Sequence, residues 1–156
     1  TGTSTGLKYG GYFSTAGSGT RWAIYAIGNS FASGGTWQVS DERLKKDVNA
    51  FKGALDKINK LDVKTYYFDT KQYPTMSFSD RKQYGIMAQN LENVFPEMVL
   101  ETEHNVPTLT GEESDNNITL KAANYNQLIP VLIKSIQEQQ VMIEELKEEI
   151  EALKKQ

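Results

Sequence analysis

The sequence predicts a mixed α+β fold with a specialised segment at each end. Nine of the twelve glycines lie in residues 1–39 among several aromatic residues, a composition typical of short strands and tight turns. Residues 122–156 repeat apolar residues at heptad spacing, which predicts a long coiled-coil helix. We therefore expect a glycine-rich, fibre-like β segment over residues 1–39 and a second domain over residues 40–156. The middle of this second domain is small and mixed α/β, and its helix over residues 122–156 forms oligomers.

Composition and charge exclude several kinds of site and partner. The 156-residue chain has no cysteine and one histidine, so no metal site and no cofactor is expected. Residues 1–39 carry a net charge of +2 within the total of −3, so residues 40–156 carry −5. Neither part has the basic patch of a nucleic-acid-binding protein, and no apolar run approaches the roughly 18 residues of a membrane span. We expect a soluble C-terminal piece of a longer protein that binds neither nucleic acid nor a membrane.

The N-terminal segment is expected to need partner chains. Its aromatic runs at residues 9–13 and 21–26 are separated by glycine-rich turns. One thin sheet with exposed aromatic residues leaves open edges, which an intertwined β-prism or triple β-helix of several chains would cover. Two alternatives are a flexible Gly/Ser linker and a receptor-binding fibre tip in which Trp22 and Trp37 stack on glycans.

The C-terminal segment has the apolar stripe of a parallel coiled coil between chains. Isoleucine fills the a positions and leucine the d positions, with one glutamine as a polar layer. An amphipathic helix packed on its own domain is the alternative, plausible up to about Leu132. Isoleucine at a with leucine at d mildly favours two strands, whereas a buried glutamine can reset the number of strands. The predicted seam residues, in chain order, are Ile129, Leu132, Ile136, Gln139, Ile143, Leu146, Ile150 and Leu153.

The middle of the chain predicts short helices and strands. Apolar residues recur at helical spacing in one stretch, β-branched and aromatic residues alternate in others, and a polar, acidic stretch with Pro107 and Gly111 predicts an exposed loop. The predicted elements are a helix over 54–61, strands over 63–68 and 83–88, a helix over 89–94, a loop over 101–117, a brief strand over 118–120 and a helix from near 122.

Several blocks in this region resemble a known family in order and spacing. The first is Ser40-Asp41-Glu42-Arg43-Leu44-Lys45, and the later ones are Tyr84-Gly85-Ile86-Met87-Ala88-Gln89, Phe95-Pro96-Glu97-Met98-Val99 and Tyr125-Asn126-Gln127-Leu128-Ile129. Residues 40–140 resemble the endosialidase-type intramolecular chaperones, the self-cleaving C-terminal domains of phage tailspikes, tail fibres and neck appendages. Asn90 departs from the pattern, which has an acidic residue after Ala-Gln.

The resemblance implies a homotrimer that brings three chains into register and promotes β-helix folding of the upstream fibre, its folding client. It further implies that the domain then cuts itself free through a serine-lysine dyad. Ser40 would be the nucleophile and Lys45 the base, supported by Asp41, Glu42 and Arg43. Assembly would take place in the host cytoplasm, after which the mature fibre stays in the virion and the chaperone domain is released. A permanent structural trimer module without proteolysis is the competing function.

The dyad sets a geometric requirement on the chain. A serine hydroxyl needs an adjacent base, and a lysine serves when burial or a neighbouring cation such as Arg43 lowers its pKa. In a strand, Ser40 and Lys45 would point to opposite faces, and in a helix they would lie roughly 140° apart. The dyad therefore needs a turn near Asp41 and Glu42, or a Lys45 from a neighbouring chain.

Three further points stay open from the sequence. The bond between Val39 and Ser40 is the favoured site of cleavage, and the bond between Ser40 and Asp41 is the alternative. Lys46 competes with Lys45 as the base. Ser40 followed by two acids is also a common helix start, in which the hydroxyl caps the first turn.

Overall fold

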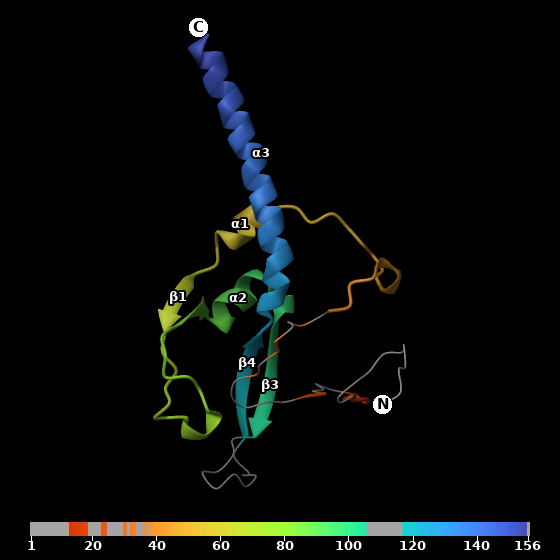
Figure 1. Ribbon diagram of the computed structural model, residues 1–156, viewed down its shortest axis with the longest axis vertical. Helices are drawn as coiled ribbons and strands as arrows, with labels where there is room; N and C mark the ends of the chain where they lie inside the picture. The colour runs from red at the N-terminus through yellow and green to blue at the C-terminus, as the bar shows by residue number, and fades with distance from the viewer. Residues whose placement is uncertain are drawn as a thin grey trace.

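The computed structural model shows a small α+β domain with a long helix projecting from it (Figure 1). The residues that the structure describes are 13–18, 23, 24, 30, 32, 33, 36, 38–105 and 117–155. Most of the predicted fibre segment, including Trp22 and Trp37, lies outside these residues, so its β structure stays a prediction. The α+β class and the long C-terminal helix are confirmed for the described part of the chain.

Two antiparallel hairpins and three helices make up the domain. Strand β1 pairs with β2, and β3 pairs with β4. In Figure 1, the β3–β4 hairpin and the outer part of α3 extend in opposite directions, with α1 beside α3. The elements are α1 (Ala54–Ile58), β1 (Val63–Tyr66), β2 (Gln83–Ile86), α2 (Ala88–Val94), β3 (Val99–Asn105), β4 (Asn117–Ala123) and α3 (Leu128–Lys154).

The hydrophobic core lies where α1, α2 and the first turns of α3 meet. Leu91 and Phe95 are four residues apart, which places both on the inner side of α2, and neither exposes more than 1% of its surface. Pro96 follows Phe95 and begins a 3₁₀ turn after α2. The buried cluster consists of Ala54, Leu91, Phe95, Met98, Leu128 and Val131.

Two hydrogen-bonded contacts fasten the β1–β2 hairpin to the rest of the domain. The Tyr125 hydroxyl donates to the carbonyl of Ile86 at 2.6 Å and accepts from its N–H at 3.0 Å. A Cβ at Gly85 would lie 3.1 Å from this hydroxyl, so the glycine admits the tyrosine. The Asn90 side chain accepts from the N–H of Asp62 at 2.8 Å and donates to the carbonyl of Lys60 at 3.4 Å. An acidic residue at position 90 could only accept, so the amide suits this double contact.

The predicted bounds of a loop and of the last helix differ most from the structure. Residues 101–105 form the second part of β3 instead of a loop, with Glu101 opposite Lys121, and residues 106–116 of the predicted loop lie outside the described residues. The helix predicted from Ala122 begins at Leu128, because Ala122 and Ala123 still pair with β3 and the Asn124 N–H donates to the carbonyl of Met98 at 2.8 Å. The helix predicted to form oligomers is therefore α3, preceded by a strand and a 3₁₀ turn.

Leu91 provides a direct test of the core. Replacing it with alanine in this fully buried site should lower the free energy of unfolding by about 2–5 kcal/mol, because the change leaves a cavity. The matched control is Leu100→Ala, since Leu100 is 45% exposed and should cost less than about 1 kcal/mol. Urea denaturation followed by circular dichroism measures both. Equal losses for the two variants would contradict this location of the core.

Candidate functional site

The sequence Ser40 to Lys45 folds into a tight turn. The Asp41 carboxylate accepts a hydrogen bond from the N–H of Arg43 at 2.9 Å and forms an ion pair of 2.7 Å with its guanidinium. Behind this cap, residues Glu42–Leu44 form a 3₁₀ turn, closed by the Lys45 N–H donating to the carbonyl of Glu42 at 2.9 Å. Aspartate favours such a position because its short side chain bonds the backbone two residues on.

This turn brings the two candidate dyad residues together within one chain. The Lys45 ammonium nitrogen Nζ lies 2.9 Å from the Ser40 hydroxyl Oγ and donates to it, and it also donates to the Ser40 carbonyl at 3.0 Å. The five-residue spacing is thus bridged by a turn at Asp41 and Glu42, and a neighbouring chain is not needed for the contact. Among the described residues, no hydrogen bond or ion pair joins the Lys46 side chain to Ser40.

The charged residues of the turn are paired with each other. The side-chain hydrogen bond with Arg43 holds the pKa of Asp41 below its ordinary value of 3.8, with a further contribution from the Arg43 N–H. The same side-chain bond raises the pKa of Arg43. Arg43 is therefore engaged by a carboxylate instead of standing as an unpaired cation beside Lys45. Glu42 lies exposed on the turn.

We call residues 40–53 the arm, because this segment loops away from the domain before rejoining it at α1 (Figure 1). Every residue of the arm is exposed. Leu44 and Val48, both apolar, are 74% and 71% exposed. The candidate dyad therefore lies on a solvent-accessible extension of the domain, apart from its core.

Helix α3 has a packed face and an unpacked face. Leu128, Val131 and Ser135 are buried against the domain, and the Ser135 hydroxyl donates to the Val131 carbonyl at 2.9 Å. The seven apolar residues of the predicted seam are 39–67% exposed, and Gln139 is exposed as well. At about 100° per residue, the seam lies beside the packed face in the first turns, where Leu132 follows buried Leu128 by four residues. From residue 139 to residue 155 the helix is exposed, so the domain leaves this part of the seam uncovered.

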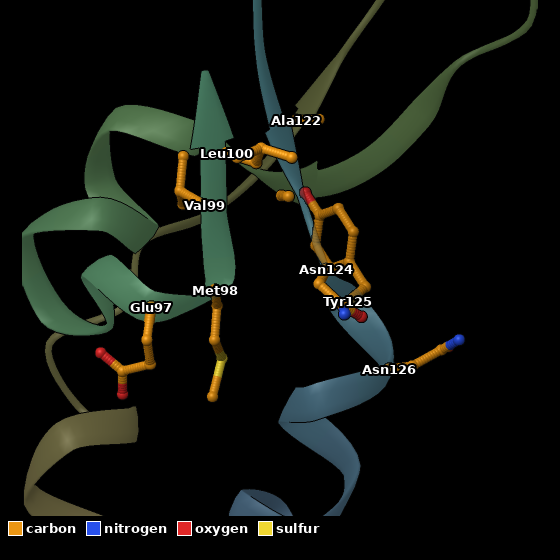
Figure 2. A pocket seen from close by; sticks show the side chains of 9 residues that line it. Glu97, Met98, Val99, Leu100, Ala122, Asn124, Tyr125 and Asn126 are labelled. Atoms are coloured by element: carbon orange, nitrogen blue, oxygen red, sulfur yellow. The ribbon is translucent and has the colours of Figure 1, made fainter. Parts of the chain in front are cut away.

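A separate cavity of about 670 Å³ lies at the junction of β3, β4 and the start of α3 (Figure 2). It is lined by residues 97–100 and 122–126, with Tyr125 at one side, and no residue of the arm contributes to it. In the described ranges, no group of three or more His, Cys, Asp or Glu side chains is arranged to hold a metal ion. No α-helix in this part of the chain combines the length and the apolar character needed to span a bilayer.

Comparison with known proteins finds a similarity that covers the candidate site. Residues 40–100 match the model of a peptidase family described as chaperone of endosialidase. The match begins at Ser40, the first residue of the turn, and it confirms the resemblance found in the sequence.

The chain is also similar to a phage fibre protein. It shares 27% identity over 115 residues with the long tail fibre protein Gp37 of Salmonella phage S16. The aligned region is 74% of this chain and 14% of that protein, so the chain corresponds to a small part of the relative. The chain is thus related both to a chaperone family and to a fibre protein.

The Asp41 cap predicts a measurable titration. Since hydrogen bonding with Arg43 lowers the pKa of Asp41, the capped turn should be complete above about pH 3.8 and should be lost as the pH falls through the lowered value. NMR titration of the Asp41 carboxyl should give a pKa below 3.8 in the wild type. In Arg43→Ala it should return towards 3.8, because the largest contribution is removed. An unchanged pKa in this variant would contradict the pairing.

Proposed function

We propose that residues 40–156 are an intramolecular chaperone that trimerises, brings an upstream phage fibre into register and then releases itself by autoproteolysis. The observation that carries the proteolytic part is the 2.9 Å contact between Lys45 Nζ and Ser40 Oγ. It places a potential base within hydrogen-bonding distance of a potential nucleophile, as nucleophilic catalysis requires. The match to a peptidase family of chaperones supports the same function.

The proposed reaction begins with an acyl shift. Lys45, in its uncharged form, takes the proton from the Ser40 hydroxyl as Oγ attacks the carbonyl carbon of Val39. The bond from this carbon to the Ser40 nitrogen breaks, and the proton held by Lys45 passes to that nitrogen. Water then hydrolyses the resulting ester, which restores the Ser40 hydroxyl and leaves a carboxylate on Val39. Ser40 becomes the first residue of the released domain.

The bond between Val39 and Ser40 fits this chemistry better than the bond between Ser40 and Asp41. Attack of Oγ on the preceding carbonyl passes through a five-membered ring, whereas attack on the serine's own carbonyl needs a strained four-membered ring. Assistance from the Asp41 carboxylate is also disfavoured, because both of its oxygens accept hydrogen bonds from Arg43. The Lys45 ammonium also donates to the Ser40 carbonyl, a contact that orients the amine beside Oγ.

The proposed chaperone activity needs no nucleotide. Three α3 helices that bury their exposed seams against one another hold the upstream chains together at high local concentration and in one register. Nonlocal β pairing is slow because distant segments must first meet, and registered assembly shortens that search. Removal of the registering domain then makes return to the unfolded state slow, so persistence of the fibre becomes kinetic.

The dyad is tested by the intact mass of freshly made protein. The wild type should yield a fragment that begins at Ser40, and Ser40→Ala should leave the chain whole because no nucleophile remains. Lys45→Ala should slow cleavage at least a hundredfold, since base catalysis contributes roughly 10²–10⁴ in rate. The matched control is Lys46→Ala, which removes the same charge one position along the chain but spares the contact and should cut like the wild type.

Mixing the two inactive variants distinguishes cleavage within one chain from cleavage between chains. Because the contact forms within one chain, assemblies of Ser40→Ala with Lys45→Ala should show no rescue. Rescue in the mixture would show that Lys45 acts on a neighbour. An uncut wild type would favour the permanent structural trimer module instead.

The seam is tested by the mass of the assembly in solution. Light scattering should give three chains for the wild type. Ile143→Asp should dissociate the trimer, because three carboxylates would meet in one buried layer. The matched control is Val141→Asp, since Val141 is 54% exposed on the same helix but lies outside the seam. A mass of two chains, or dissociation by both variants, would contradict the proposed trimer.

A further inference from the structure

In the described part of the chain, hydrogen bonds hold the arm to the rest of the domain only at its base, near which the Phe51 ring lies 6.0 Å from the Lys57 ammonium of α1. Across residues 40–52, the described hydrogen bonds and ion pairs join arm residues to one another, as when the Asn49 side chain donates to the carbonyl of Asp47 at 2.8 Å. None joins this stretch to another described part of the chain. The position of Ser40 and Lys45 relative to the domain therefore depends on how the chain is held where it enters α1.

Glu138 of α3 holds this base with both carboxylate oxygens. One oxygen accepts from the N–H of Gly53 at 3.0 Å, and the other accepts from the N–H of Leu55 at 2.9 Å. No side chain of the arm itself caps α1. Gly53 has a left-handed conformation with φ of 70°, which few other residues adopt readily. Glu138 thus fixes two backbone amides on either side of Ala54, a residue with no exposed surface.

The location of Glu138 on α3 links the arm to the seam. Glu138 immediately precedes Gln139, the polar residue of the predicted seam, and its side chain points to α1 while the seam stays exposed. In a parallel assembly with the helices in register, three Glu138 carboxylates lie at one height along the bundle. The three arm bases attached to them then lie at one height as well.

We infer that Glu138 is a positioning residue for self-cleavage, transmitting the register of the assembled helices to the arms that hold Ser40 and Lys45. This inference rests on the proposed function. Glu138 touches neither reacting residue, so its effect is indirect: it fixes where the arm leaves the domain and hence where the Val39–Ser40 bond is presented. With the carboxylate removed, the arm base keeps its glycine but loses both side-chain acceptors.

The test compares Glu138→Ala and Glu138→Gln with Glu145→Ala as the matched control. Glu145 occupies the same heptad position one repeat later and is exposed, and its side chain makes no hydrogen bond to another described residue. Three quantities are measured on the full chain: cleavage rate by intact mass, assembly size by light scattering, and hydrogen exchange at the amides of Gly53 and Leu55.

Glu138→Ala should exchange at these two amides at least tenfold faster and cleave at least tenfold more slowly, with an unchanged assembly size. Glu138→Gln should recover part of both effects, because its amide oxygen still accepts one of the two bonds. Glu145→Ala should match the wild type. The partial rescue separates positioning from a general loss of stability.

The possible failures are distinguishable. Wild-type exchange in Glu138→Ala would show that the carboxylate does not hold the arm, and faster exchange with wild-type cleavage would show that holding it does not matter for the reaction. Either result overturns the inference. An uncut wild type overturns the proposed function and the role in cleavage together, whereas exchange at Gly53 and Leu55 still decides whether Glu138 anchors the arm.

Discussion

One continuous helix, α3, both completes the hydrophobic core of the domain and carries the predicted coiled-coil seam. Its first turns complete the hydrophobic core through Leu128 and Val131, whereas every residue from 139 to 155 is exposed. A solvated helix of this length is marginal on its own in water, because tertiary contacts supply most helical stability. The exposed seam provides the missing contacts only when other chains cover it. The domain core and the proposed assembly thus depend on one continuous helix, and a shift in its register would move both.

The two residues of the candidate site lie only five positions apart in the chain. Ser40 and Lys45 meet through a turn of four intervening residues, stabilised by the Asp41 cap, and no distant element among the described residues contributes a hydrogen bond to this turn. The contact is therefore complete in a single chain. If cleavage depends on assembly, the dependence has to arise elsewhere than in bringing the serine and the lysine together. Presentation of the Val39 carbonyl is the step that assembly can still control, and the positioning role inferred for Glu138 assigns that control to the base of the arm.

The sequence predicted the parts of the fold that have a strong period. The heptads of α3 and the alternation in β1 and β2 were visible because one side of each element is apolar. The end of β3 was not visible, because its alternating residues Glu101, Thr102 and Glu103 are all polar, although Thr102 is buried. The start of α3 was placed too early for a related reason. Alanine strongly favours helix, and pairing with β3 overrides this preference at Ala122 and Ala123.

Some residues of the candidate site can be predicted from the sequence and others cannot. The sequence motif indicated Ser40, Lys45 and the need for a turn between them, since all of this information is local. It did not indicate Glu138, which lies 85 positions from Gly53 in the chain and looks like any other acid on a solvated helix. Nor did it reveal why Asn90 is an amide, because the two backbone groups that it joins become neighbours only after folding. A single sequence does not indicate which residues will form contacts between elements that are far apart in the chain.

The location of the proposed cut relative to the core decides what happens to the products. Within the described part of the chain, Ala54 is the first residue of the buried cluster, and the arm before it is exposed throughout. Breaking the chain at Val39–Ser40 therefore removes no core contact from the chaperone domain, which keeps its whole arm. The cut by itself changes connectivity without changing packing, so cleavage alone does not drive the two parts away from each other. Separation therefore has to follow from how weakly the released domain holds the finished fibre.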